Sequence, residues 1–197
     1  RTVGQQIREV LTLHGTSRSA AAARTIDLLG MVGVRDASTR VDDYPHQFSG
    51  GMRQRVIIAI AIANNPSLLI ADEPTTALDV TVQAEILRLL LSLREELDMA
   101  VMLITHDIGV VEETCDDALV LYAGEIAERG PVDEVLGRPR HPYPRELIAA
   151  TPRLDNFTGG RLVSVAGQPP DVMKRPTGCA FHPRCPLAVD RCLTEDP

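Results

Sequence analysis

Two short apolar runs, separated by a helix-length segment, constrain the fold of this chain more than any other feature. The first run, Ser67–Ala71, leads directly into the carboxylates Asp72 and Glu73, and the second run covers Met99–Thr105. Between the two runs, Val80–Leu97 carries apolar residues at helical spacing. Apolar strands that alternate with helices are typical of a parallel sheet covered by helices. We therefore predict an α/β fold in which both strands are buried.

The chain divides into three zones that differ in pattern. Residues 1–48 are helical in periodicity, and residues 49–129 alternate between helix and strand. At the end of the second zone, Ala118–Tyr122 and Glu125–Glu128 are predicted strands joined by a tight Ala-Gly turn. Residues 130–197 hold most of the chain's 14 prolines, which indicates a loop-rich C-terminal module.

The composition fits one globular domain with an appendage, since 44% of the 197 residues are hydrophobic and 24% are charged. The net charge of −7 provides no basic field, so we expect no nucleic-acid partner. No apolar run reaches the roughly 18 residues that a membrane-spanning helix needs. The sparse use of cysteine suits a reducing cytosol.

The two carboxylates at the end of the first apolar run are candidates for catalysis. Ligands of α/β sheets bind at the carboxyl ends of the strands. There, Asp72 can hold Mg²⁺, directly or through water, and Glu73 can orient and deprotonate an attacking water. The alternative is a strand end that simply meets solvent.

A second candidate site precedes the predicted helix Met52–Asn64. Ser49 suits an N-cap, and the glycines Gly50 and Gly51 allow close approach of a backbone. The amide groups of such a helix start favour a phosphate. The alternative is an ordinary capped helix with a flexible entry.

Two further polar residues follow the predicted strands. His106 comes directly after the second strand, so it lies beside Asp72 and Glu73 if the two strands pair. A neutral histidine donates one hydrogen bond and accepts another, so it can link a γ-phosphate to the attacking water. Asp79 is either an acid at the start of a helix or a member of the site, and its fixed distance from Glu73 favours the site.

The motifs resemble a known family when they are taken in order. Ser-Gly-Gly-x-x-Gln, Asp-Glu-Pro, Ala-Leu-Asp and Thr-His-Asp follow one another within residues 49–107, as in the nucleotide-binding domains of ABC transporters. Ser49–Gln54 resembles the family's signature loop, with Phe48 and Met52 in place of the usual Leu and Gln. The resemblance implies a P-loop NTPase-like parallel sheet core with a helical subdomain, the latter within residues 1–48.

The resemblance also implies roles for individual residues. Such domains work as head-to-tail pairs, so Ser49 and Gly51 would touch the γ-phosphate of ATP that is held mainly by the partner subunit. Gln54 and Asp79 would be further nucleotide-binding residues. In the other site of the pair, Asp72 would serve Mg²⁺, Glu73 would be the general base, and His106 would sense the γ-phosphate.

The sequence departs from the family in one respect, because it contains no G-x-x-x-x-G-K-[ST] phosphate loop. In the family, this loop and the glutamine loop precede the helical zone. We expect a truncated gene product that binds ATP poorly on its own, because the missing loop supplies much of the phosphate binding. The alternative is a non-enzymatic regulatory or structural subunit.

The C-terminal zone resembles the tails of di- and oligopeptide importer ATPases, through His141–Leu147, Gly167–Pro170 and Gly178–Pro186. Nickel importers and other solute importers share this tail. The resemblance implies a second ATPase subunit, two membrane permease subunits and an extracytoplasmic solute-binding protein as partners. It places the protein peripherally, at the cytoplasmic face of the inner membrane. A non-transport ABC ATPase that acts on DNA or ribosomes is the alternative.

Three cysteines of this tail, Cys179, Cys185 and Cys192, lie close together in the sequence. In this subfamily, the tail resembles an iron–sulfur site, so a 4Fe–4S cluster with a fourth cysteine further along is one interpretation. Zinc bound by the same cysteines and His182 is a second, and three reduced structural thiols are a third. Cys115 lies on a predicted core helix, where a packing role is expected.

Overall fold

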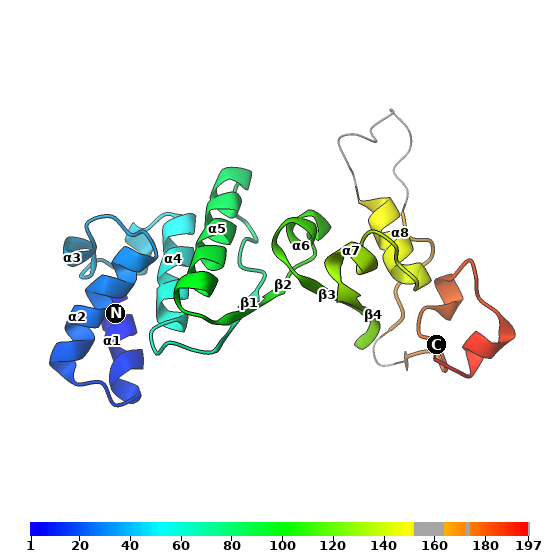
Figure 1. Ribbon diagram of the computed structural model, residues 1–197, viewed down its shortest axis with the longest axis horizontal. Coiled ribbons are helices and arrows are strands. Elements are labelled where there is room, and N and C mark those ends of the chain that lie inside the picture. Colours follow the sequence, from blue (N-terminus) through cyan, green and yellow to red (C-terminus); the bar gives the residue numbers. More distant parts are fainter. Residues whose placement is uncertain (152–163, 172–173, 197) are drawn as a thin grey trace. The chain divides into compact units, whose positions relative to one another are not determined.

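The computed structural model describes residues 1–151, 164–171 and 174–196. It consists of two compact units, Arg1–His106 and Asp107–Pro197, which are described separately (Figure 1). The division falls directly after His106, whereas the sequence pattern placed boundaries after residues 48 and 129. The three-zone division therefore stays a prediction.

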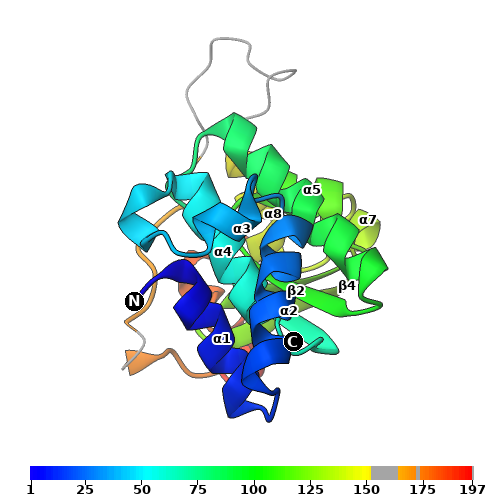
Figure 2. The same cartoon turned by 90° about the vertical axis from the view of Figure 1, so that its left-hand side faces the viewer.

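The first unit is built mainly of helices whose apolar faces meet in one aliphatic core. Helix α1 begins with a capping box. The Gln5 N–H donates to Oγ1 of Thr2, and the Thr2 N–H donates to Oε1 of Gln5. The apolar face of α1 is buried, through Val3, Ile7 and Leu11, which agrees with the helical periodicity predicted for this zone. Helices α1 and α2 lie side by side (Figure 2). The helices of this unit are α1 (Val3–Leu13), α2 (Arg18–Met31), α3 (Ala37–Arg40), α4 (Gly50–Ala61) and α5 (Val80–Glu96).

Two parallel strands complete the first unit. Strand β1 (Leu68–Asp72) pairs with strand β2 (Ala100–Ile104), and α5 connects them. Because the strands are parallel and in register, Asp72 lies opposite Ile104 and both strands end at the same edge. The predicted strand–helix–strand unit with parallel strands is confirmed.

The two faces of this strand pair differ in burial. Leu69 and Ala71 are buried in the core shared with α4 and α5. By contrast, Leu68 and Ile70 on the opposite face are 45% and 59% exposed, and Met102 on β2 is 51% exposed. The prediction that both strands are fully buried is wrong, because within the described residues the core packs against only one face.

The second unit contains an antiparallel hairpin of β3 and β4. The residues of its turn, Ala123 and Gly124, have φ values of 50° and 84°. Two positive φ values in a two-residue turn match the right-handed twist of paired strands. The predicted hairpin is thereby confirmed. The elements of this unit are α6 (Ile108–Thr114), β3 (Asp117–Tyr122), β4 (Glu125–Pro131), α7 (Val132–Val135), α8 (Pro142–Ala150) and the 3-10 turns His182–Arg184 and Asp190–Leu193.

An aromatic cluster joins the hairpin of the second unit to the C-terminal segment. The ring of Phe181 lies 5.1 Å from that of Tyr122 and 5.4 Å from that of Tyr143, between centroids. Arg184 donates to the Tyr122 hydroxyl at 3.2 Å and to the Ala166 carbonyl at 2.7 Å. Separately, Cys115 packs at the edge of a smaller aliphatic cluster around Val135, as predicted.

Over the described ranges, none of the helices has the length and apolar character that crossing a membrane requires.

Candidate functional site

Glu73 occupies a constrained position directly after β1. Its backbone N–H donates to the Ile104 carbonyl at 2.9 Å, so the pairing with β2 continues one residue beyond the strand. Its φ of 47° lies in the left-handed region, which a residue with a side chain rarely adopts. Such outliers concentrate at functional sites, because the surrounding structure must hold them in place.

The Glu73 carboxylate accepts a hydrogen bond at each of its oxygens. Nδ1 of His106 lies 2.8 Å from Oε1, and the Thr76 hydroxyl donates to Oε2 at 2.6 Å. Since an ionised carboxylate only accepts, His106 donates from Nδ1. The Thr76 bond and then the His106 bond lower the pKa of Glu73 below its usual value. The carboxylate is thus held ionised, as a general base requires.

Thr76 reaches the carboxylate because the loop after β1 turns back on itself. The N–H of Thr76 donates to the Glu73 carbonyl at 3.2 Å, which closes a turn with the buried Pro74 as its second residue. Sequence reasoning gave Thr76 no role of its own at this carboxylate. The signal that could have found it is a hydroxyl three residues after Glu73, across a proline that favours a turn.

Asp72 is exposed at the same sheet edge as Glu73 and His106. An exposed carboxylate at the carboxyl end of a parallel strand is a donor of the kind that Mg²⁺ prefers. The structure therefore brings the predicted residues Asp72, Glu73 and His106 to one edge of the sheet, and Asp72 fits the role of a magnesium ligand.

The start of α4 carries the other predicted phosphate-contacting residues. Ser49 is the N-cap, since its Oγ accepts from the Met52 N–H at 3.3 Å. Ser49 and Gly50 are exposed, whereas Gln54 is half-buried in the second turn of the helix. The N–H groups at this exposed helix start can bind an anion that comes from another molecule.

The two glycines of this helix start also meet the loop and helix that follow Glu73. A Cβ added at Gly50 would lie 3.3 Å from Leu78, and one at Gly51 would lie 2.5 Å from Val82. Gly51 is therefore required for close packing of α4 on α5. The sequence suggested close approach of a backbone and binding of a phosphate here, but it did not predict that Gly51 makes room for the side chain of Val82.

Asp79 is the N-cap of α5, and its Oδ1 accepts from the Val82 N–H at 3.0 Å. A helix-start role is thus present in the structure, and the nucleotide-site role of Asp79 stays a prediction.

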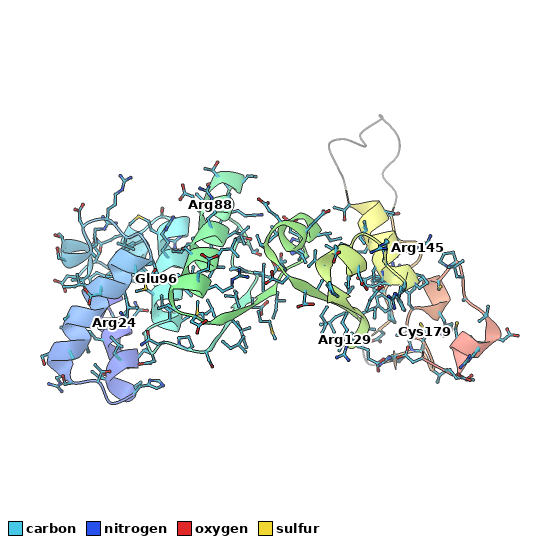
Figure 3. The ribbon with its side chains drawn as sticks, viewed as in Figure 1. Arg24, Arg88, Glu96, Arg129, Arg145 and Cys179 are labelled. Atoms are coloured by element: carbon cyan, nitrogen blue, oxygen red, sulfur yellow. The ribbon has the colours of Figure 1, made fainter. Side chains whose placement is uncertain are left out.

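The three cysteines of the C-terminal segment lie in or against the aromatic cluster of the second unit (Figure 3, Cys179 labelled). Burial raises the pKa of the Cys179 thiol, whose sulfur lies 4.0 Å from Nε2 of His141. Across the part of the chain that the structure describes, no group of three or more His, Cys, Asp or Glu residues is arranged to hold a metal ion. The three cysteines, as placed, do not form a ligand set for either an iron–sulfur cluster or zinc.

Two protein families match the sequence. The family described as "ABC transporter" matches residues 2–76, which include Asp72, Glu73 and Thr76. The family described as "Oligopeptide/dipeptide transporter, C-terminal region" matches residues 127–192, which include all three cysteines of the C-terminal segment.

Curated relatives match the chain over its whole length. A peptide import ATP-binding protein of Brucella abortus is 52% identical over 197 residues, which are 100% of this chain and 59% of that protein. The dipeptide transport ATP-binding protein DppD of Escherichia coli is 50% identical, over 100% of this chain and 60% of DppD. The chain therefore spans about three fifths of the length of these relatives.

Solved structures of ABC transporter cassettes share the fold. CbiO1 of Clostridium perfringens, part of the ABC transporter complex CbiONQ, matches with a TM-score of 0.62 and 29% identity, over 70% of this chain and 53% of that chain. The dimeric bacterial ABC transporter cassette MJ0796 matches with a TM-score of 0.58 and 32% identity, over 67% of this chain and 57% of that chain. The expected P-loop NTPase-like α/β fold is thereby confirmed.

Proposed function

Because the chain belongs to the ABC transporter family of ATP-binding proteins, we propose that it is part of an ATP-hydrolysing subunit that powers the import of di- or oligopeptides. The observation that carries this proposal is the Glu73 carboxylate at the strand edge, held by His106 and Thr76. The match of residues 127–192 to the oligopeptide/dipeptide type of C-terminal region supports peptides as the solute.

In the proposed reaction, water attacks the γ-phosphate and gives a proton to Glu73, while the bond from the γ-phosphorus to the bridging oxygen breaks and ADP leaves. The lowered pKa of Glu73 keeps it ionised, and the hydrogen bond from His106 holds one carboxylate oxygen in place. Asp72 is the proposed ligand of Mg²⁺, an ion that neutralises phosphate charge when it is bound with ATP. Asp79 is proposed to lie at the border of the same nucleotide site.

The helix start at Ser49–Gly51 is proposed to serve a second nucleotide, held mainly by a partner ATPase subunit. Ser49 and Gly50 are exposed, and the N–H groups of a helix start attract phosphate oxygens. Gln54 is proposed to support this contact from the next turn. The 197 residues contain no Lys-bearing phosphate loop, so we propose that turnover belongs to a longer protein that includes this chain.

The remaining partners of this subunit follow from the proposed import function. They are two membrane permease subunits and an extracytoplasmic solute-binding protein, with the ATPase bound at the cytoplasmic face of the inner membrane. Uptake by membrane vesicles containing the assembled transporter tests the solute. We expect a labelled dipeptide to accumulate with ATP, whereas accumulation of Ni²⁺ alone would contradict a peptide importer.

Replacing the general base tests the proposed hydrolysis. In the full-length subunit within its transport complex, we expect Glu73→Gln to abolish steady-state ATP turnover while ATP binding is retained. The matched control is Glu96→Gln on the exposed end of α5 (labelled in Figure 3), which we expect to turn over normally. Normal turnover by Glu73→Gln would remove the general-base assignment.

For the C-terminal segment, we propose that Cys179, Cys185 and Cys192 are ligands of a 4Fe–4S cluster with a fourth ligand. Their close spacing in the sequence motivates this proposal, and their side chains would have to rearrange to form a ligand set. Anaerobic purification of the full-length protein should give a brown product that contains iron. A colourless product with zinc would favour the alternative with His182, and a metal-free product would favour reduced thiols.

A further inference from the structure

We infer that Thr76 is a positioning residue, which fixes the Glu73 carboxylate in the orientation needed to receive a proton from water. The inference rests on the proposed role of Glu73 as the general base. It concerns a hydroxyl that contacts this base.

The first argument is geometric. The two donors approach different oxygens of the carboxylate, with Nδ1 of His106 2.8 Å from Oε1 and Oγ1 of Thr76 2.6 Å from Oε2. A carboxylate held at both oxygens cannot rotate about its terminal bond without breaking one of these contacts. An ionised carboxylate has about four acceptor positions, so two donors leave room for a water.

The second argument concerns how firmly each donor is anchored. The His106 side chain is 82% exposed and reaches Glu73 from the segment that follows β2. Thr76, by contrast, has a short side chain on a loop fixed by hydrogen bonds from Thr76 N to the Glu73 carbonyl at 3.2 Å and from Leu78 N to the Thr75 carbonyl at 3.1 Å. A short hydroxyl on a fixed loop loses little conformational entropy when it holds its acceptor.

The third argument is the cost of the loop conformation. Both Glu73 and Ala77 have positive φ values, 47° and 65°. Two residues with side chains in the left-handed region of one short loop are unfavourable unless surrounding contacts maintain them. The hydrogen bond from the Thr76 hydroxyl to the Glu73 carboxylate spans this loop. It is a contact that helps the loop to keep this shape.

Substitution of Thr76 in the full-length subunit within its transport complex tests the inference. Thr76→Val keeps the shape and removes the donor, Thr76→Ala removes both, and Thr76→Ser keeps the donor. We expect Val and Ala to lower kcat about three- to tenfold, which is the effect of one hydrogen bond to an accessible carboxylate. The KM for ATP should not change, and Ser should restore kcat.

Two readouts separate positioning from a purely structural role of Thr76. A change in the fold of the loop would alter the KM for ATP together with kcat, whereas loss of the donor alone lowers kcat and leaves KM in place. Thr76→Ser, which keeps the donor to Oε2 of Glu73, should restore kcat. Thr75→Val, at the neighbouring position of the same loop, is the matched control and should leave both kcat and KM in place.

The outcomes separate the inference from the proposed function. If Glu73→Gln turns over normally, the general-base assignment fails and the inference fails with it. If Glu73→Gln is inactive but Thr76→Val and Thr76→Ala keep the wild-type kcat, only the role of Thr76 is overturned. A raised KM with unchanged kcat, or failure of Ser to restore kcat, would likewise overturn it.

Discussion

The two compact units of the chain are stabilised by different kinds of contact. In the first unit, aliphatic side chains from several helices share one core, with Ile7, Leu28 and Ile86 completely buried. In the second unit, the contact between hairpin and C-terminal segment depends on aromatic rings around Phe181 and on the hydrogen bonds of Arg184. The large aliphatic core of the first unit can hold the strained loop that begins at Glu73. The stability of the small aromatic cluster, by contrast, depends on the ring of Phe181.

This difference matches where the proposed chemistry lies. The loop that begins at Glu73, with its left-handed residues, follows a strand that is packed on the larger core. The cysteines lie at the smaller cluster, where Cys179 is itself a buried member. Changes in the first unit should therefore act on turnover, and changes in the second on the accessibility of the thiols.

The largest expected effect is the loss of the central ring of the second unit. Phe181 is 1% exposed, and truncation of such a ring costs about 3–5 kcal/mol of stability. In the metal-free full-length protein, we expect Phe181→Ala to open the aromatic cluster and to accelerate alkylation of the Cys179 thiol by a thiol reagent. Leu28→Ala, an equally buried position of the first unit, is the control and should leave this rate near wild type. Alkylation of Cys179 at the wild-type rate in Phe181→Ala would show that the ring does not shield this thiol.

A smaller effect is expected where α4 packs on α5. A methyl group at Gly51 would lie 2.5 Å from Val82, so Gly51→Ala should destabilise the first unit by about 1–3 kcal/mol through overpacking. Adding Val82→Ala should recover part of this loss, because it removes the methyl group that clashes. Thermal unfolding of the single and double variants measures both effects.

Gly30 offers the matched control for Gly51. It lies in the last turn of α2, and a Cβ there would meet nothing within 4 Å. We expect Gly30→Ala to leave stability unchanged or to raise it by up to about 1 kcal/mol, because alanine favours the helix. Equal effects at Gly30 and Gly51 would contradict the packing role.

The sequence allowed the prediction of features that depend on local pattern and order. Two apolar runs joined by a helical segment predicted parallel strands, and parallel strands that end together bring Glu73 and His106 to one edge. Features that depend on distant neighbours were not predictable. The exposure of Ile70 depends on which elements cover the sheet, and the need for glycine at position 51 depends on Val82 of another helix.

A further modest effect distinguishes the two interpretations of Asp79. As the N-cap of α5, its carboxylate accepts from the Val82 N–H, and alanine at such a position costs about 0.5–2 kcal/mol. Asparagine keeps a capping oxygen, so Asp79→Asn should preserve the unfolding temperature while Asp79→Ala lowers it. If Asp79 also belongs to the nucleotide site, Asp79→Asn should lower ATP turnover of the transport complex despite its preserved stability. Wild-type turnover in Asp79→Asn would restrict this residue to capping, and the proposed site would then consist of Asp72, Glu73 and the donors around them.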